Sequence, residues 1–318
     1  MAREYLSPNV LFEHVQDARY FHGPRFFAPE HDGHISLPQP LAQPKLDAAG
    51  HAITDHHGMP EFESLWELHT PWPILNEMVE PLELAFTKFM LLEIVAAVLL
   101  VIIFGLLALR LRGGAAPRGL LTNLLESMLL FIRDKVARPA IGHDADRYLP
   151  LLWTMFFFLL ACNLLGMIPW LGAPTSALAT TGALAFVTFA VVVFSGMKQY
   201  GFVGFFKAQV PHMDLPKPIA IFLLPMIFVI EMLGLLIKHF ILAIRLLANM
   251  MAGHIVLGVI IGFIGFTAAS GAIWYAVTPA SIIGAVLLSV LELFVAFLHA
   301  YIFTFLSALF IGAAVHSH

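Results

Sequence analysis

The longest apolar run in the chain is IAIFLLPMIFVIEMLGLLIKHFILAIRLLANMMAGHIVLGVIIGFIGF, residues 219–266. A single helix through all of these residues would be about 72 Å long, whereas the hydrocarbon core of a bilayer is about 30 Å thick. Its glycines mark no obvious turn. The run therefore predicts either a turn that the residue pattern does not reveal or one helix that crosses the membrane at a steep tilt.

A second overlong run follows at residues 279–315, and residues 267–278 join the two. This second run also exceeds the roughly 20 residues that one membrane crossing needs. The C-terminal third of the chain is therefore predicted to be a hairpin of two overlong, tilted helices.

Shorter apolar segments precede this hairpin. Residues 118–139 alternate at helical spacing between apolar and charged side chains, which indicates an amphipathic helix on the membrane surface rather than a span. Ordinary membrane spans are predicted at 89–109, 149–170 and 178–197. The fold class is accordingly an all-α polytopic membrane protein with about five membrane-embedded helices and one surface helix.

The composition of the 318 residues supports this fold class. Hydrophobic residues make up 59% and charged residues 12% of the chain, and the mean hydropathy is +0.85. A soluble domain has about 25% charged residues. The formal charge of −4 excludes a basic nucleic-acid binder, and the single cysteine excludes a disulfide framework.

The charge is concentrated at the N-terminus, since 13 of the 21 acidic residues lie within residues 1–88. We interpret 1–88 as a polar arm, in which 14–62 is mostly irregular and exposed, followed by a membrane domain, 89–318. Basic residues follow the first span at Arg110 and the third at Lys198, and bases flank the cytoplasmic ends of spans. The arm is therefore expected outside and the C-terminus in the cytoplasm.

Charged and polar side chains inside the first overlong helix lie on one stripe. At 100° per residue, Glu231 and Asn249 each lie about 40° from Arg245, and Lys238 lies about 20° from it. His254 lies on the opposite side, about 180° away. Intramembrane charges are costly, so these residues are candidates for function.

The second overlong helix carries Glu292 and His299 seven positions apart, on one face. Arginine keeps its proton at physiological pH, whereas glutamate and histidine can exchange protons there. A fixed cation on one face and exchangeable groups on others are suited to ion translocation. Proton is favoured as the ion, and no ATP-binding motif is present, so this chain is not expected to catalyse a reaction on ATP by itself.

The stretch from Arg245 to His254, RLLANMMAGH, resembles the signature of subunit a of F-type ATP synthases, the stator channel subunit of the membrane sector. Further segments occur in the order of that family, and the resemblance covers about residues 115–318. They are Pro117–Gly119 with Glu126, Asn163–Pro169, Pro174–Ser176, Leu291–Glu292 and Ala300–Phe303.

The resemblance implies roles for the polar residues. Arg245 would be the essential arginine beside the rotating ring of c subunits, where it would block direct proton flow between two half-channels. Asn249, His254, Glu292 and His299 would line the outer half-channel, and Glu231 would lie on the path to the cytoplasm. Many members carry Glu where His254 stands and Gln where His299 stands, so the relay would be rearranged here.

The resemblance also implies the setting. The partners would be the c ring, the b subunits of the peripheral stalk, the F1 sector through the complex, and the lipid bilayer, in a bacterial plasma membrane. No cofactor and no nucleic-acid partner are expected.

Two other functions remain open from the residues alone. A secondary transporter could use the same buried charges, although such proteins show inverted repeats or broken helices. A membrane haem protein could use His239, His254 and His299 as axial ligands. The histidines of the arm, His51, His56 and His57, are better explained as a solvated loop than as a metal site, and no metal is expected.

Overall fold

The computed structural model describes residues 18–22, 34–39, 42–47, 51–54, 60–64, 67–68, 82–83, 86–111, 119–168, 171–208 and 217–315. Within them, five helical stretches are long and apolar enough to cross a membrane, which confirms the all-α polytopic class. These stretches are Lys88–Leu111, Leu120–Gly166, Leu178–Phe205, Leu223–Thr267 and Ala272–Val315.

The described parts of the N-terminal arm contain short antiparallel strand pairs, joined by residues without regular structure. Backbone pairing of residues so far apart is invisible to a periodicity argument. The pairs are β1 (Tyr20–His22) with β2 (His34–Ser36), β3 (Ala42–Pro44) with β4 (Phe62–Ser64), and β5 (Glu67–Leu68) with β6 (Leu82–Glu83).

The arm is tied to the membrane domain where the first span begins. Gln39 uses both ends of its amide on one residue, because its Nε2 donates to the Phe86 carbonyl at 2.7 Å and its Oε1 accepts from the Phe86 amide at 3.1 Å. The Lys88 amide donates to the carbonyl of Ala18 at 2.9 Å. Helix α3 (Lys88–Leu111) then crosses the membrane; between Lys88 and Arg110 its one charged residue is Glu93.

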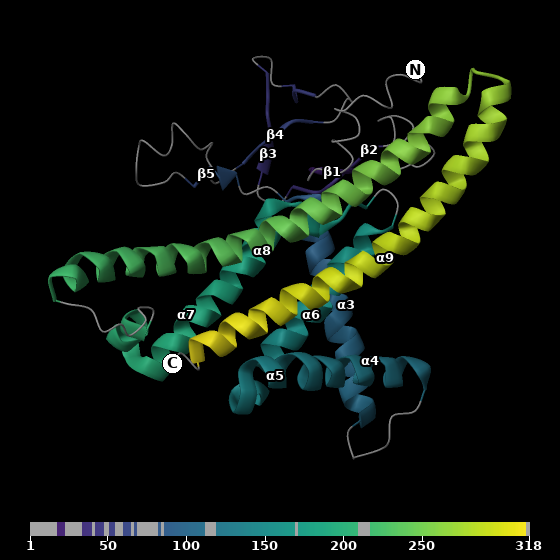
Figure 1. Cartoon of the computed structure of the whole chain (residues 1–318). Coiled ribbons are helices and arrows are strands. Elements are labelled where there is room, and N and C mark those ends of the chain that lie inside the picture. Colours follow the sequence, from purple (N-terminus) through teal and green to yellow (C-terminus); the bar gives the residue numbers. More distant parts are fainter. Residues whose placement is uncertain are drawn as a thin grey trace.

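A layer of short helices closes the end of the bundle opposite the strands (Figure 1). It consists of α4 (Leu120–Phe131), a π-helix (Ile132–Ala137) and α5 (Arg138–Ile141). The helix predicted over 118–139 begins at Leu120 and continues past Pro139 to Ile141. The wider π-turn ends with the Arg138 amide bonded to the Arg133 carbonyl, five residues back, and the proline follows at the start of α5.

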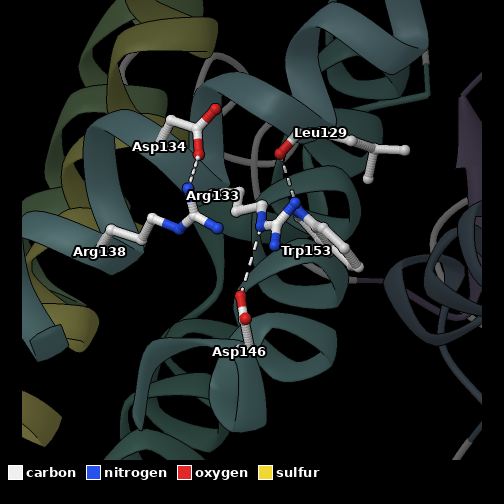
Figure 2. Close-up of polar contacts among 6 residues, drawn as sticks. All are labelled: Leu129, Arg133, Asp134, Arg138, Asp146 and Trp153. Carbon is white, nitrogen blue, oxygen red and sulfur yellow. Dashed lines mark hydrogen bonds and ion pairs between the residues drawn. The ribbon is translucent and has the colours of Figure 1, made fainter. Parts of the chain in front are cut away.

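Polar contacts join this layer to the next helix, α6 (Ala145–Gly166), as Figure 2 shows. The Trp153 indole donates to the Leu129 carbonyl at 3.0 Å, and Arg133 Nε lies 3.3 Å from Asp146. Arg138 pairs with Asp134 at 3.0 Å within the layer. These contacts fix the angle between the surface layer and the spans.

Helices α6 and α7 (Leu178–Ala208) form a hairpin around the 3-10 turn Pro174–Ser176, called η4. The predicted hairpin is therefore present, with shifted ends. The predicted span 149–170 is observed as 145–166. The predicted span 178–197 is extended to residue 208 with a break at Gly201, whose φ of 74° a residue with a Cβ rarely adopts.

The two overlong helices are α8 (Lys217–Thr267) and α9 (Ala272–Val315). Figure 1 shows them running antiparallel and obliquely across the other spans. Of the two alternatives for residues 219–266, a turn within the run is therefore excluded, and one steeply tilted helix is observed. Residue 279 was expected to begin the second helix. Instead α9 begins at Ala272, and Pro279 lies inside it as Pro225 lies inside α8, so each proline removes one intrahelical bond. The turn after Thr267 ends at Gly271.

The core lies between the surface layer, α6 and α9. Its fully buried members include Ile132, Phe156, Phe303 and Ile311, each at most 1% exposed. Gly312 of α9 is in contact with α5, because a Cβ atom built there would overlap the Ala140 carbonyl. The absence of a side chain at Gly312 therefore determines how closely α9 approaches the surface layer.

We predict that Gly312→Ala lowers the thermal unfolding midpoint of the purified complex, since overpacking against a backbone atom costs about 1–3 kcal/mol. Gly182→Ala is the matched control, because a Cβ at Gly182 meets no atom within 4 Å. Equal midpoints for the two variants would contradict the packing described.

Candidate functional site

The polar stripe predicted on the first overlong helix is present on α8. Glu231, Lys238, Arg245 and Asn249 all lie on its exposed face. Their side chains are thus not buried within the described chain, and four polar residues in a membrane helix need a partner that is not lipid.

His254 points the other way, toward α9. Its side chain is 15% exposed, and its Nδ1 lies 3.7 Å from Oε1 of Glu292, which is 7% exposed. That distance is too long for a direct hydrogen bond and short enough for one bridging water or a small shift. Gly253 makes the approach possible, because a Cβ there would overlap the Glu292 carboxylate.

Arg245 and His299 form a second association between the same helices. His299 is 8% exposed, and the guanidinium of Arg245 is close enough for its charge to act on the imidazole. The two associations follow the antiparallel register of the hairpin. They are separated by nine residues on α8, about 14 Å along its axis, and by seven on α9, about 11 Å.

Glu231 is not brought to this cluster. It precedes Arg245 by 14 positions, so the two lie about 21 Å apart along the axis of α8. Arg245 therefore lies between an acid on one side and the His254–Glu292 pair on the other. Asn249 lies one helical turn from Arg245, on the exposed face.

A buried amide that the sequence argument left without a role holds this part of α9 in place. Asn163 of α6 is 1% exposed; its Nδ2 donates to the Ala296 carbonyl at 3.1 Å, and its Oδ1 accepts from the Thr175 hydroxyl at 2.7 Å. Ala296 lies between Glu292 and His299. The bonds thus tie the segment that carries both titratable residues to the α6–α7 hairpin. In the sequence, the one sign of this role was an Asn within an apolar span, since a buried amide needs hydrogen-bond partners.

Glu93 is a further polar group near the outer part of the bundle. Its Oε1 accepts from the Thr180 hydroxyl at 2.5 Å, which joins α3 to the first turn of α7. Because the hydroxyl satisfies part of the carboxyl, Glu93 has a structural reason to be in the span.

The histidines do not gather as haem ligands would. His239 is 3% exposed and packs between Phe189 and Phe310, with ring centroids 5.3 and 4.9 Å away, and its Nδ1 lies 2.8 Å from the Leu235 carbonyl. In the arm, His51 lies 3.8 Å from Asp47, and both are exposed; His56 and His57 lie outside the described residues. No group of three metal-ligating side chains occurs in the described part of the chain.

Comparison with known proteins places these features in a family. Residues 90–312 match the family described as ATP synthase A chain. The chain is 39% identical over 274 residues to the ATP synthase subunit a of Chloroherpeton thalassium, covering 85% of this chain and 77% of that protein.

Two further relatives are similar to the same extent. The ATP synthase subunit a of Myxococcus xanthus is 40% identical over 241 residues, 74% of this chain and 76% of that one. The ATP synthase subunit a 2 of Chlorobaculum tepidum is 39% identical over 275 residues, 85% of this chain and 74% of that one.

We predict that Asn163→Leu destabilises the chain by about 1–3 kcal/mol, because it leaves the buried Thr175 hydroxyl without its acceptor. The thermal unfolding midpoint of the purified complex measures this. The control is Thr154→Val, which removes an exposed hydroxyl bonded only to the Pro150 carbonyl of its own helix. An unchanged midpoint for Asn163→Leu would show that the amide does not hold α9.

Proposed function

The chain belongs to the ATP synthase A chain family, the subunit a of the membrane sector of F-type ATP synthases, and from this premise we propose that Arg245 separates two offset proton half-channels. Membership makes the chain a multi-pass membrane protein that works in a complex with other ATP synthase subunits. It also favours this function over the secondary transporter and the haem protein.

The observation that carries the proposal is the order of groups along α8. The fixed cation of Arg245 lies between Glu231 on one side and His254 with Glu292 on the other. A proton that moves between the two acids must pass a guanidinium that cannot release its own proton. Such an order suits two pathways that do not connect directly.

The partner of the exposed face is the c ring. In the family, each c subunit carries a carboxylate that passes the essential arginine. The positive charge of Arg245 favours the ionised form of that carboxylate while the two groups face each other. A proton from the outer pathway then neutralises it, and the neutral carboxyl can move into lipid at far lower cost than the charged one.

The outer pathway consists of Asn249, His254, Glu292 and His299. The buried His254–Glu292 pair can pass a proton between an imidazole and a carboxylate, two groups that exchange protons near neutral pH in proteins. On α9, His299 follows Glu292 by seven residues and lies near Arg245 of α8, so it stands between the His254–Glu292 pair and the arginine. Glu231 begins the pathway to the cytoplasm, and each proton that crosses 100 mV supplies about 2.3 kcal/mol.

The orientation follows from the basic residues. Arg110, Arg147 and Lys198 lie near span ends, and Arg133, Lys135 and Arg138 lie in the surface layer itself. This excess supports a cytoplasmic position for the surface layer and the C-terminus and an external position for the arm, in a bacterial plasma membrane. The b subunits of the peripheral stalk and the F1 sector complete the assembly.

We predict that Arg245→Ala reduces proton-driven ATP synthesis to background, because no fixed cation then separates the pathways. Synthesis in vesicles that contain the complete enzyme, energised by an imposed pH gradient without sodium, measures this. Lys238→Ala removes another exposed cation of α8 and should retain most of the rate. A normal rate for Arg245→Ala would refute the assignment.

We predict that Glu292→Gln slows proton entry, because the amide cannot carry a proton while it keeps nearly the same shape. The measurement is passive proton flux through vesicles after F1 removal, at several external pH values, and a change in external pH should relieve part of the defect. Glu126→Gln, on the surface helix α4, should leave the flux unchanged. An unaltered flux for Glu292→Gln would remove this residue from the pathway.

A further inference from the structure

A groove of about 310 Å³ lies along α7 where it meets the first turn of α6, and no residue of the exposed stripe of α8 lines it. Two cations, Arg147 of α6 and Lys198 of α7, line it together with Ser195. The rest of its wall is apolar: Phe186, Val187, Ala190, Val191 and Phe194. The groove thus combines a long apolar floor with a pair of positive charges.

Both cations lie at the same membrane boundary. Arg147 is in the first turn of α6 and Lys198 is near the end of the straight part of α7, and the two helices form a hairpin, so these ends lie on one side. Helix α7 breaks three residues after Lys198, at Gly201. The apolar wall then extends from this boundary into the membrane.

The positive charge of the groove is not neutralised from within. None of its lining residues is acidic. The acid beside Arg147 in sequence, Asp146, contacts Arg133 of the surface layer at 3.3 Å (Figure 2). The guanidinium of Arg147 instead lies 5.7 Å from the centroid of the Tyr148 ring. An anion at the boundary would therefore meet two cations at once.

The dimensions of the groove match one lipid leaflet. From Phe186 to Lys198 the helix rises about 18 Å, and half of the hydrocarbon core is about 15 Å. A transmembrane helix of a partner, about 10 Å wide, would occupy about 1,400 Å³ over the same length, several times the volume of the groove. An extended hydrocarbon chain fits this shape.

We propose that this groove binds one anionic phospholipid, with its phosphate between Arg147 and Lys198 and one acyl chain along Phe186 to Phe194. Basic pockets between membrane helices at the cytoplasmic boundary recognise anionic headgroups by the same chemistry. The ligand is a membrane lipid rather than soluble phosphate, because the apolar wall contributes only when the anion carries a chain. The site needs only that the chain spans a membrane, so it stands independently of the roles assigned to Arg245 and Glu292.

The test is photolabelling of the complete enzyme in phosphatidylcholine vesicles with a trace of phosphatidylglycerol that carries a photoactivatable acyl chain. We expect label on the peptide of residues 186–198. The double variant Arg147→Gln with Lys198→Gln should lower that labelling about tenfold or more, because each cation near an anionic headgroup contributes about one power of ten or slightly less.

Two variants separate charge from shape. Arg110→Gln with Lys135→Gln removes two exposed cations from the same side of the membrane, outside the groove, and should leave the labelling unchanged. Ala190→Trp keeps both charges and fills the apolar wall, so it should lower the labelling. Proton-driven synthesis by each variant confirms that the enzyme is assembled.

Three results would overturn the proposal. One is equal labelling of residues 186–198 by a matched phosphatidylcholine probe. Another is an equal loss in the two double variants, which would indicate a general surface-charge effect. The third is full competition by inorganic phosphate, which would identify a soluble anion as the ligand.

Discussion

The cost of placing charge in hydrocarbon governs the whole molecule. A charged side chain is tolerated at membrane depth only where another group or polypeptide compensates it. Arg245 lies on the exposed face of α8, where the described chain does not bury it. The titratable partners Glu292 and His299 are instead buried between helices. Helix α8 thus carries an exposed cation, whereas the titratable residues of α9 are buried.

The scaffold around these helices keeps that division in register. Helix α9 crosses the other spans obliquely (Figure 1). Asn163 of α6 bonds directly to its backbone beside Glu292 and His299. At the far end, Gly312 lets the surface layer approach α9 closely. The helix is therefore held near its relay residues and near its C-terminus.

Much of this could be predicted from the sequence, because 100° per residue fixes which side chains share a helix face. That geometry alone placed Glu231 and Arg245 on one stripe and His254 opposite, and the structure shows the same. Helix ends were less predictable. Pro279 was expected to begin α9, yet the helix begins earlier, at Ala272, and continues through the proline with one intrahelical bond missing. Contacts between distant residues, such as Asn163 with Ala296, have no local signal beyond a polar residue in an apolar run.

The central claim is that Arg245 separates two water pathways open to opposite sides of the membrane. Single cysteines at position 231 and at position 292, in a Cys162→Ala background, can be exposed in sealed, oriented vesicles to a small membrane-impermeant thiol reagent added to one side at a time. The account predicts that position 292 reacts only from the side of the N-terminal arm and position 231 only from the opposite side. Reaction of both cysteines from the same side would contradict it.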